Sequence, residues 1–144
     1  MAADLNAIRA ALASVIAAGI PNLRAYGQFQ SQINPPCAVI LPQPNQLLRF
    51  DTLEGGLTYM LRVVVLVAYT EDASSQTALD AYLGNLTTSI NKLIRSNPTL
   101  GGACESADVT AVRGYGAGAS GYGLTEWAGQ QYLGTNLLVN VMAT

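Results

Sequence analysis

Residues 57–69 read LTYMLRVVVLVAY and include the most apolar stretch of the chain, Met60 to Ala68. Its length and its many β-branched residues predict one long strand. Alternate residues of a strand point to opposite faces of a sheet. One face would carry Tyr59, Leu61, Val63, Val65, Val67 and Tyr69, and the other Met60, Arg62, Val64, Leu66 and Ala68. Because both sets are largely apolar, we expect both faces of this strand to be covered.

Helices are predicted on either side of this strand. Before it, Leu5, Ile8, Leu12, Val15 and Ile16 recur at helical spacing. Asp4 is a suitable N-cap, and Gly19 followed by Pro21 is a stop signal. The remaining face of this helix is mostly alanine, so another surface can approach it closely. After the strand, a second helix is expected from the N-terminal signals at residues 71–75 to Ser96.

The other segments read as strands: a short one within 23–27, then 37–41, one around 109–112, and two more at 124–131 and 132–142. The order lacks a regular alternation of strands and helices, which argues against a doubly wound parallel fold. We therefore expect a single α+β domain over residues 1–144, with two helices packed on one face of a mainly antiparallel sheet.

Two long connections are predicted to be flexible loops. Residues 43–56 are polar and contain Pro and Gly, and loops of this length are usually functional or mobile. Residues 114–123 read GYGAGASGYG, which is too rich in glycine for regular structure. We interpret this second stretch as a flexible hairpin tip that carries Tyr115 and Tyr122.

The composition favours a subunit of an assembly. Of the 144 residues 50% are hydrophobic and 11% are charged, whereas about 25% is usual for charged residues. A membrane protein or a soluble subunit that buries surface against copies or partners fits this composition. No stretch of about 20 apolar residues predicts a spanning helix, and Asp4 stands where a signal peptide has positive charge. We expect a cytoplasmic protein, without a role in binding nucleic acid because its net charge is −2.

No catalytic, cofactor-binding or metal-binding residues are selected by the sequence. It contains no histidine, which removes the commonest general base and most zinc sites. Gly116, Gly118 and Gly121 match GxGxxG formally, but the segment leads into a predicted strand and not a helix. Cys37 and Cys104 are best interpreted as buried hydrophobic residues. We expect a protein that is not an enzyme and has no cofactor.

Residue type and expected exposure indicate several candidate interface residues. They are Arg49, Phe50 and Leu53 in the first loop, and Tyr115 and Tyr122 in the second. Arg62 interrupts an apolar strand face and has two interpretations. It is either solvated at the edge of the sheet or paired with a charge across a subunit boundary.

The order of segments resembles the tail-terminator (tail-completion) proteins of long-tailed bacteriophages. The segments that carry the resemblance span nearly the whole chain: DLNAIRAALASVIAAGIPNLRAYG (4–27), NPPCAVILP (34–42), YMLRVVVLVAYTED (59–72), SSQTALDAYLGNL (74–86), NPTLGG (97–102) and YLGTNLLVNVMAT (132–144). The resemblance rests on the order of the elements and on short turn sequences, and it involves no catalytic motif. The glycine-rich loop matches no feature of the family.

The resemblance implies a structural virion protein that assembles in the host cytoplasm. Family members form a homohexameric ring that caps the tail tube, ends its polymerisation and joins the tail to the head connector. The implied partners are copies of the chain, the tail-tube protein and the head-closure or connector protein. A head-closure or neck adaptor of the same virion type is the first alternative, and a small-ligand-binding domain that uses the glycine-rich loop is the second.

Overall fold

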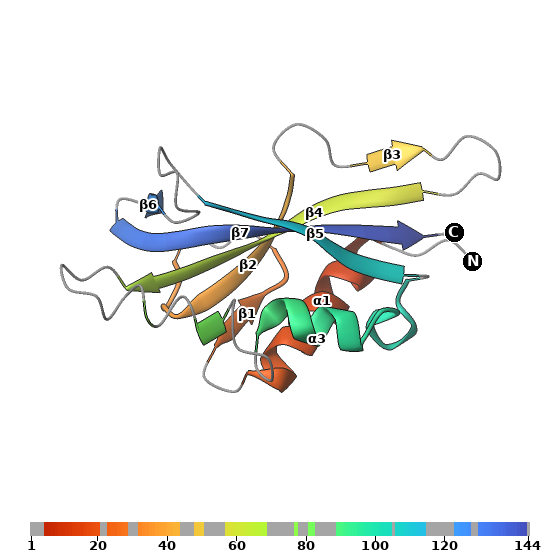
Figure 1. Cartoon of the computed structure of the whole chain (residues 1–144), viewed down its shortest axis with the longest axis horizontal. Helices are drawn as coiled ribbons and strands as arrows, with labels where there is room; N and C mark the ends of the chain where they lie inside the picture. The colour runs from red at the N-terminus through yellow and green to blue at the C-terminus, as the bar shows by residue number, and fades with distance from the viewer. Residues whose placement is uncertain are drawn as a thin grey trace.

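The α+β class predicted from the sequence is confirmed by a computed structural model, in which helices cover one face of a mainly antiparallel sheet (Figure 1). The structure describes residues 5–20, 23–28, 32–43, 48–50, 57–68, 77, 81–82, 89–104, 106–114, 123–127 and 130–143. Within this part of the chain, no helix is both long and apolar enough to span a membrane.

One sheet contains the seven strands of the described residues: β1 (Arg24–Tyr26), β2 (Cys37–Pro42), β3 (Leu48–Phe50), β4 (Leu57–Ala68), β5 (Ser106–Gly114), β6 (Gly123–Trp127) and β7 (Gln130–Ala143). The main path runs β1-β2-β4-β7-β5. Only the β1–β2 pair among these strands is parallel. β4 and β7 are paired along the whole length of β4, from Leu57 opposite Ala143 to Ala68 opposite Tyr132. This long ribbon is the centre of the fold.

On each side of the ribbon, the outer strand is divided into two pieces. β2 ends with Pro42 opposite Leu61, and β3 resumes on the same edge of β4 with Leu48 opposite Tyr59. β5 ends with Gly114 opposite Thr135, and β6 resumes on the same edge of β7 with Gly123 opposite Gly134.

The pairing corrects two predictions about the loops. The expected loop 43–56 contains the strand β3, because residues 48–50 continue the pairing with β4 beyond Pro42. The glycine-rich stretch is not the tip of a hairpin, because β5 and β6 both pair with β7 and follow one another along its edge. The hairpin is formed by β6 and β7.

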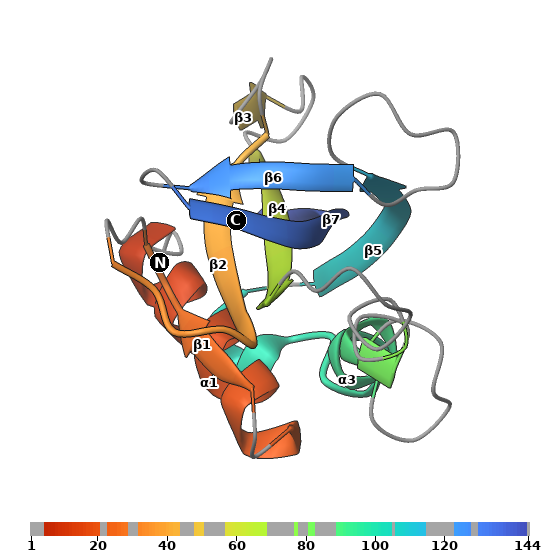
Figure 2. The same cartoon turned by 90° about the vertical axis from the view of Figure 1, so that its left-hand side faces the viewer.

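Among the described elements, the helices α1 and α3 lie next to each other beneath the sheet (Figure 2). α1 spans Leu5–Gly19, as predicted. The second helix differs from the prediction, because the backbone at Ser89 is extended (φ −73°, ψ 149°) and its hydroxyl accepts a hydrogen bond from the Lys92 N–H at 3.3 Å. Ser89 therefore interrupts the expected helix 71–96 and caps α3 (Ile90–Ser96), which a short 3-10 helix, η1 (Leu100–Gly102), follows.

The main core lies between the helices and the inner face of the sheet. Ile8, Leu12 and Ile16 of α1 are fully buried there. They pack with Ile90 and Ile94 of α3 on a sheet surface formed by Ala38, Ile40, Leu61, Val63, Val65, Leu137, Val139 and Val141. Full burial of each large aliphatic side chain contributes about 1.5–3 kcal/mol, so this layer supplies much of the folding free energy.

A second, smaller cluster covers part of the outer face. Val64 and Leu66 are fully buried there, packed with Cys37, Val39 and Ile33. The chain itself thus covers the second face of β4 at this end, and no neighbouring subunit is needed to do so. The expectation that both faces of β4 are covered is confirmed at this end of the strand.

Candidate assembly surfaces

A partly exposed apolar area remains on the outer face of the sheet, toward the start of β4. We call Leu41, Met60, Leu138 and Met142 the outer patch. The register places Arg62 between Leu41 and Leu138, and places Thr58 opposite Met142. Met142 is 44% exposed and is the exposed large hydrophobic residue of the described part of the chain. The other three members are half-buried.

Amide side chains lie beside the patch. Gln43 follows β2 directly, and its side-chain Nε2 donates to the carbonyl of Leu61 at 3.1 Å and to Oδ1 of Asn140 at 3.4 Å. Its backbone N–H donates to the carbonyl of Met60 at 3.0 Å. The side chain of Gln43 therefore reaches over β4 to Asn140 of β7. Its hydrogen bonds hold the chain in place where it leaves the sheet after β2.

Arg62 does not lie at a sheet edge. β4 has β2 on one side and β7 on the other at this position, so the interpretation of Arg62 as a solvated edge residue was wrong. Its side chain is half-buried on the outer face. Pairing with a charge of another subunit stays a prediction.

The structure places one further predicted interface residue near the outer patch. Arg49 is exposed on β3, opposite Thr58, which is in turn opposite Met142. Arg49 thus belongs to the same cross-strand row as Met142, at the margin of the patch. Phe50 lies in β3 beside it. Leu53, Tyr115 and Tyr122 lie outside the described residues.

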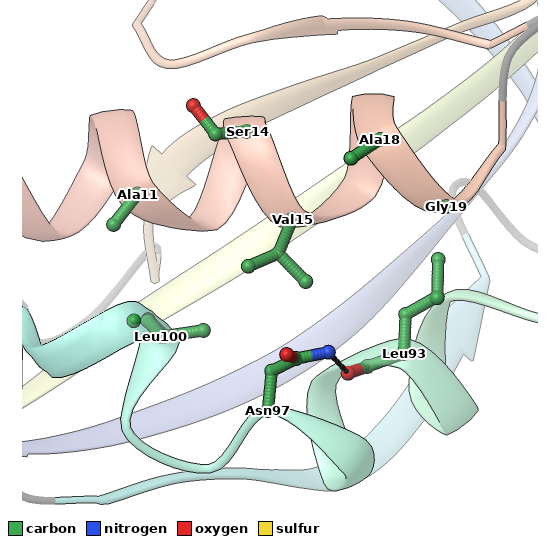
Figure 3. A pocket seen from close by; sticks show the side chains of 9 residues that line it. Ala11, Ser14, Val15, Ala18, Gly19, Leu93, Asn97 and Leu100 are labelled. Atoms are coloured by element: carbon green, nitrogen blue, oxygen red, sulfur yellow. Dashed lines mark hydrogen bonds between the residues drawn. The ribbon is translucent and has the colours of Figure 1, made fainter.

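A second apolar surface lies on the opposite layer, between the helices. We call it the helix groove; its volume is about 550 Å³ (Figure 3). α1 contributes Ala11, Ser14, Val15, Ala18 and Gly19, and the other wall is formed by Leu93, Asn97, Leu100 and Gly101. None of these residues is charged.

Two local features shape the groove. Gly19 brings the end of α1 against Leu93, because a Cβ on this glycine would lie 2.3 Å from Leu93 Cδ2. The side chain of Asn97 donates from Nδ2 to the carbonyl of Leu93 at 2.9 Å, near the C-terminus of α3. With Nδ2 already engaged in this way, the groove offers mainly apolar contacts.

A more polar hollow of about 570 Å³ lies between α1 and β1. Asn6 and Arg9 of α1 line it opposite Tyr26 and Gln28. The Arg9 guanidinium donates a hydrogen bond to Oδ1 of Asn6, so these two side chains are already paired with each other. Because Asn6 and Arg9 are hydrogen-bonded to each other, they have fewer hydrogen-bonding groups available to a ligand.

The thiols are buried, as expected from the sequence. Burial raises the pKa of the Cys37 thiol to about 11, while the charge of Arg24 acts in the opposite direction. Burial also raises the pKa of the Cys104 thiol. Both thiols are therefore protonated at neutral pH and behave as small apolar groups. Among the described residues, no group of three or more His, Cys, Asp or Glu side chains is arranged to hold a metal ion.

The sequence pointed to parts of both surfaces without defining either. Alternation along residues 57–69 placed Met60 and Arg62 on the second face, and the alanines of α1 indicated a face open to close approach. The helix groove could not be located, because it depends on residues after α3 that come close to α1 only in the folded chain.

Comparison of the chain with protein-family models gives no match, and comparison with curated proteins gives no significant match. The resemblance to tail terminators rests on the sequence segments quoted above.

Proposed function

We propose that this protein is a non-enzymatic structural subunit that assembles with copies of itself into a ring. In this proposal the ring is a tail terminator: it caps the tail tube of a long-tailed bacteriophage, ends its polymerisation and joins the tail to the head connector. The observation that carries the proposal is the presence of two apolar surfaces, the outer patch and the helix groove, on opposite layers of one small domain.

The low charge of the chain supports this function. With 11% charged residues, the protein has few charged side chains to cover its surface as a monomer. Interfaces are enriched in Met and Arg and have polar margins. The outer patch has this composition, since Met60 is next to Arg62 on the same face of β4, and Met142 shares a cross-strand row with the exposed Arg49.

Two separate surfaces also suit a ring. Each subunit of a ring has two neighbours and contacts one of them through one surface and the other through a different surface. In a two-fold dimer, both subunits use the same surface. The sequence resemblance adds the number of subunits, six, and the partners, which are the tail-tube protein and the head-closure or connector protein. It also supports a location in the virion, at the junction of tail and neck.

The decisive experiment is electron microscopy of tails assembled without this protein. A terminator predicts tubes of uncontrolled length, because nothing ends polymerisation. Normal tails that lack heads would favour the head-closure or neck alternative. Complete particles of normal length would contradict both functions. A pull-down with tail-tube subunits and another with portal-side proteins would then separate the two by partner.

The predicted interface residues give a second test. Replacing Arg49 and Phe50 together with alanine is expected to weaken assembly, because Arg49 is exposed at the margin of the outer patch. Light scattering of the purified protein, alone and with tail-tube subunits, measures this effect. Unchanged scattering in both mixtures would remove these two residues from the interface.

A further inference from the structure

We infer that the surface around Leu138, on the outer face beside β5, docks an extended segment of a partner protein. This segment presents an aliphatic side chain to Leu138 and a basic side chain to Asp108. The inference deepens the proposed function and rests on it in one respect, because the segment belongs to a partner in the assembly. Its chemistry follows from a comparison of the two halves of the sheet, one of which already holds such a segment.

The two halves of the sheet repeat one arrangement. In the first half, α1 is followed by the divided strand β2 and β3 and then by the long strand β4. In the second half, α3 is followed by the divided strand β5 and β6 and then by the long strand β7. Because β4 and β7 are antiparallel, a two-fold axis perpendicular to the sheet, through the pair Val63 and Leu137, relates the strands of the two halves. β3 and β6 accordingly lie toward opposite ends of the ribbon (Figure 1).

The inner faces of the two halves agree with this relation. The axis assigns a residue of β7 to each inner-face residue of β4, and the corresponding side chains are buried together in the main core. These pairs are Val63 and Leu137, Val65 and Val139, and Val67 and Val141. The same positions are thus buried in both halves, so their outer faces can be compared position by position.

The outer faces differ in how they are covered. There the axis relates Val64 to Leu138, and Leu66 to Asn140. Val64 and Leu66 are fully buried, because Ile33 from the segment before β2 packs with them. Leu138 and Asn140 are only half-buried, and neither belongs to this cluster or to the main core. The second half therefore has the corresponding surface without the cover.

The cover of the first half shows what kind of occupant fits. Ile33 belongs to residues 32–36, which read QINPP and lie in no helix or strand. The two prolines favour an extended backbone in the residues that precede them. The cover is thus an extended segment that contributes one aliphatic side chain, and we expect the corresponding surface around Leu138 to accept a segment of the same kind.

A charge distinguishes the second surface from the first. Cys37 of β2 lies opposite Leu66, and Asp108 of β5 lies opposite Asn140, so Asp108 takes the place of Cys37 in the second half. Cys37 is fully buried, whereas Asp108 is exposed. An occupant of the second surface therefore meets a carboxylate where the first meets a thiol. A basic side chain beside the aliphatic one complements this carboxylate.

Arg62 determines the direction in which the segment lies. It is half-buried on β4, opposite Leu138, on the side of Leu138 that faces away from β5. Leu138 thus has a positive charge toward β4 and the negative charge of Asp108 toward β5. A segment that crosses this surface is expected to place its basic end toward β5, because the opposite direction would bring two positive charges together.

Nuclear magnetic resonance of the full chain with isotope-labelled methionine methyl groups tests the site. Met142 reports on it, because it follows Asn140 on the same face of β7 and is 44% exposed. The probe is a synthetic peptide, KQINPP, which copies residues 32–36 behind a lysine. It is expected to shift the Met142 methyl signal in a saturable way at millimolar concentration, below the protein concentration at which copies associate. The peptide KQDNPP, which lacks the aliphatic side chain, is the control and should not bind.

Charge reversal tests the contact with Asp108. Asp108→Lys is expected to weaken binding of KQINPP by about fivefold at low ionic strength, the upper range for an exposed ion pair. The same variant should prefer the peptide EQINPP, in which the lysine is replaced by glutamate. Ala17→Lys adds a positive charge at an exposed position of α1, on the opposite layer, and should leave binding unchanged. Circular dichroism establishes that each variant is folded.

The outcomes separate this inference from the proposed function. A Met142 signal that KQINPP does not shift, equal binding of KQDNPP, or equal binding to Asp108→Lys would overturn the docking site. The proposed ring would then be unaffected, because tail length is measured without the peptide. Conversely, tails of normal length in the absence of the protein would overturn the terminator function, while the peptide data would still decide whether the surface around Leu138 binds such a segment.

Discussion

Gly19 and Leu93 are in contact at one end of the helix groove, where a Cβ on the glycine would lie 2.3 Å from Leu93 Cδ2. Real Cβ atoms essentially never come this close to another heavy atom. Glycine at this position therefore allows α1 and α3 to approach, and Leu93 occupies the space that a side chain would take. The contact fixes the relative position of the two walls of the groove.

Replacing Gly19 with alanine is expected to destabilise the protein by about 1 kcal/mol. Alanine favours the helix by about 1 kcal/mol, but overpacking costs typically 1–3 kcal/mol. The added methyl group forces the Leu93 side chain out of its place. Urea denaturation followed by circular dichroism measures the change in the free energy of unfolding.

Leu93→Ala provides the matched background for this substitution. With the leucine side chain removed, the methyl group of Gly19→Ala meets no obstacle, and the helix propensity makes the change stabilising. The sign of the effect should therefore reverse between the two backgrounds. Additive effects in the double-mutant cycle would show that the contact does not determine the helix packing.

The cap at Ser89 gives a second prediction. Ser89 is buried, and its hydroxyl accepts a hydrogen bond from the Lys92 N–H at 3.3 Å. Ser89→Ala is expected to cost about 1 kcal/mol of stability, the usual value for losing an N-cap. Ser96→Ala, at the exposed end of α3, is the control and should change stability by less than about 0.5 kcal/mol. Equal effects in thermal melts would contradict a capping role.

Ser89 also shows where sequence patterns are ambiguous. The apolar residues before and after it continue at helical spacing, so periodicity alone predicted one helix. A serine inside such a pattern either faces solvent or caps a new helix. In the fold, Ser89 caps a new helix, because its backbone is extended and its hydroxyl accepts from the Lys92 N–H.

The long strands were predictable because their patterns are local. The alternation within residues 57–69 predicts a strand, and β4 spans Leu57–Ala68. The division of the outer strands was not predictable. Whether residues 48–50 and 123–127 return to the same edges of β4 and β7 depends on pairing between distant segments, which leaves no local trace in the sequence.

The two faces of β4 show how far the sequence predicts the candidate assembly surface. The alternation predicts the correct set of outer-face residues, but it does not distinguish those that the chain itself buries from those that stay partly exposed. In the fold, Val64 and Leu66 are buried by the chain itself, while Met60 is only half-buried. The difference arises because Ile33, from the segment before β2, packs with the first pair.

The buried thiol of Cys37 predicts a loss of stability at alkaline pH. Its pKa is raised by burial from an ordinary value of 9.0 to about 11. Well below pH 9 the thiol is protonated in both the folded and the unfolded chain, so its contribution to stability is constant. Between pH 9 and 11 the unfolded chain loses this proton while the folded chain keeps it, so stability falls as pH rises.

Cys37→Val isolates this contribution, because valine is apolar and does not titrate. The difference in urea midpoint between pH 8 and pH 10.5 should be smaller in the variant than in the wild type. Other groups that titrate in this range, among them Cys104 and Tyr82, are present in both proteins and cancel. An identical pH dependence would show that the Cys37 thiol is not shielded in the folded state.

Asn136 and Asn140 lie on the outer face of β7 and differ in how their side-chain oxygens are satisfied. Oδ1 of Asn136 is buried and accepts no hydrogen bond in the described part of the chain. Oδ1 of Asn140 accepts a hydrogen bond from Gln43 at 3.4 Å. A buried acceptor without a donor costs about 1–3 kcal/mol.

Asn136→Leu is therefore expected to stabilise the isolated subunit by about 1 kcal/mol, since it replaces an unsatisfied amide with an apolar side chain opposite Val64. Asn140→Leu makes the same chemical change on the same strand but removes an existing hydrogen bond, so it should be neutral or destabilising. The difference between the two variants, measured by urea denaturation below the concentration at which copies associate, cancels the shared change in strand propensity. A destabilising Asn136→Leu would mean that its amide makes a necessary contact within the subunit. A variant that is more stable but assembles less well would instead assign the missing donor for Oδ1 to a neighbouring copy.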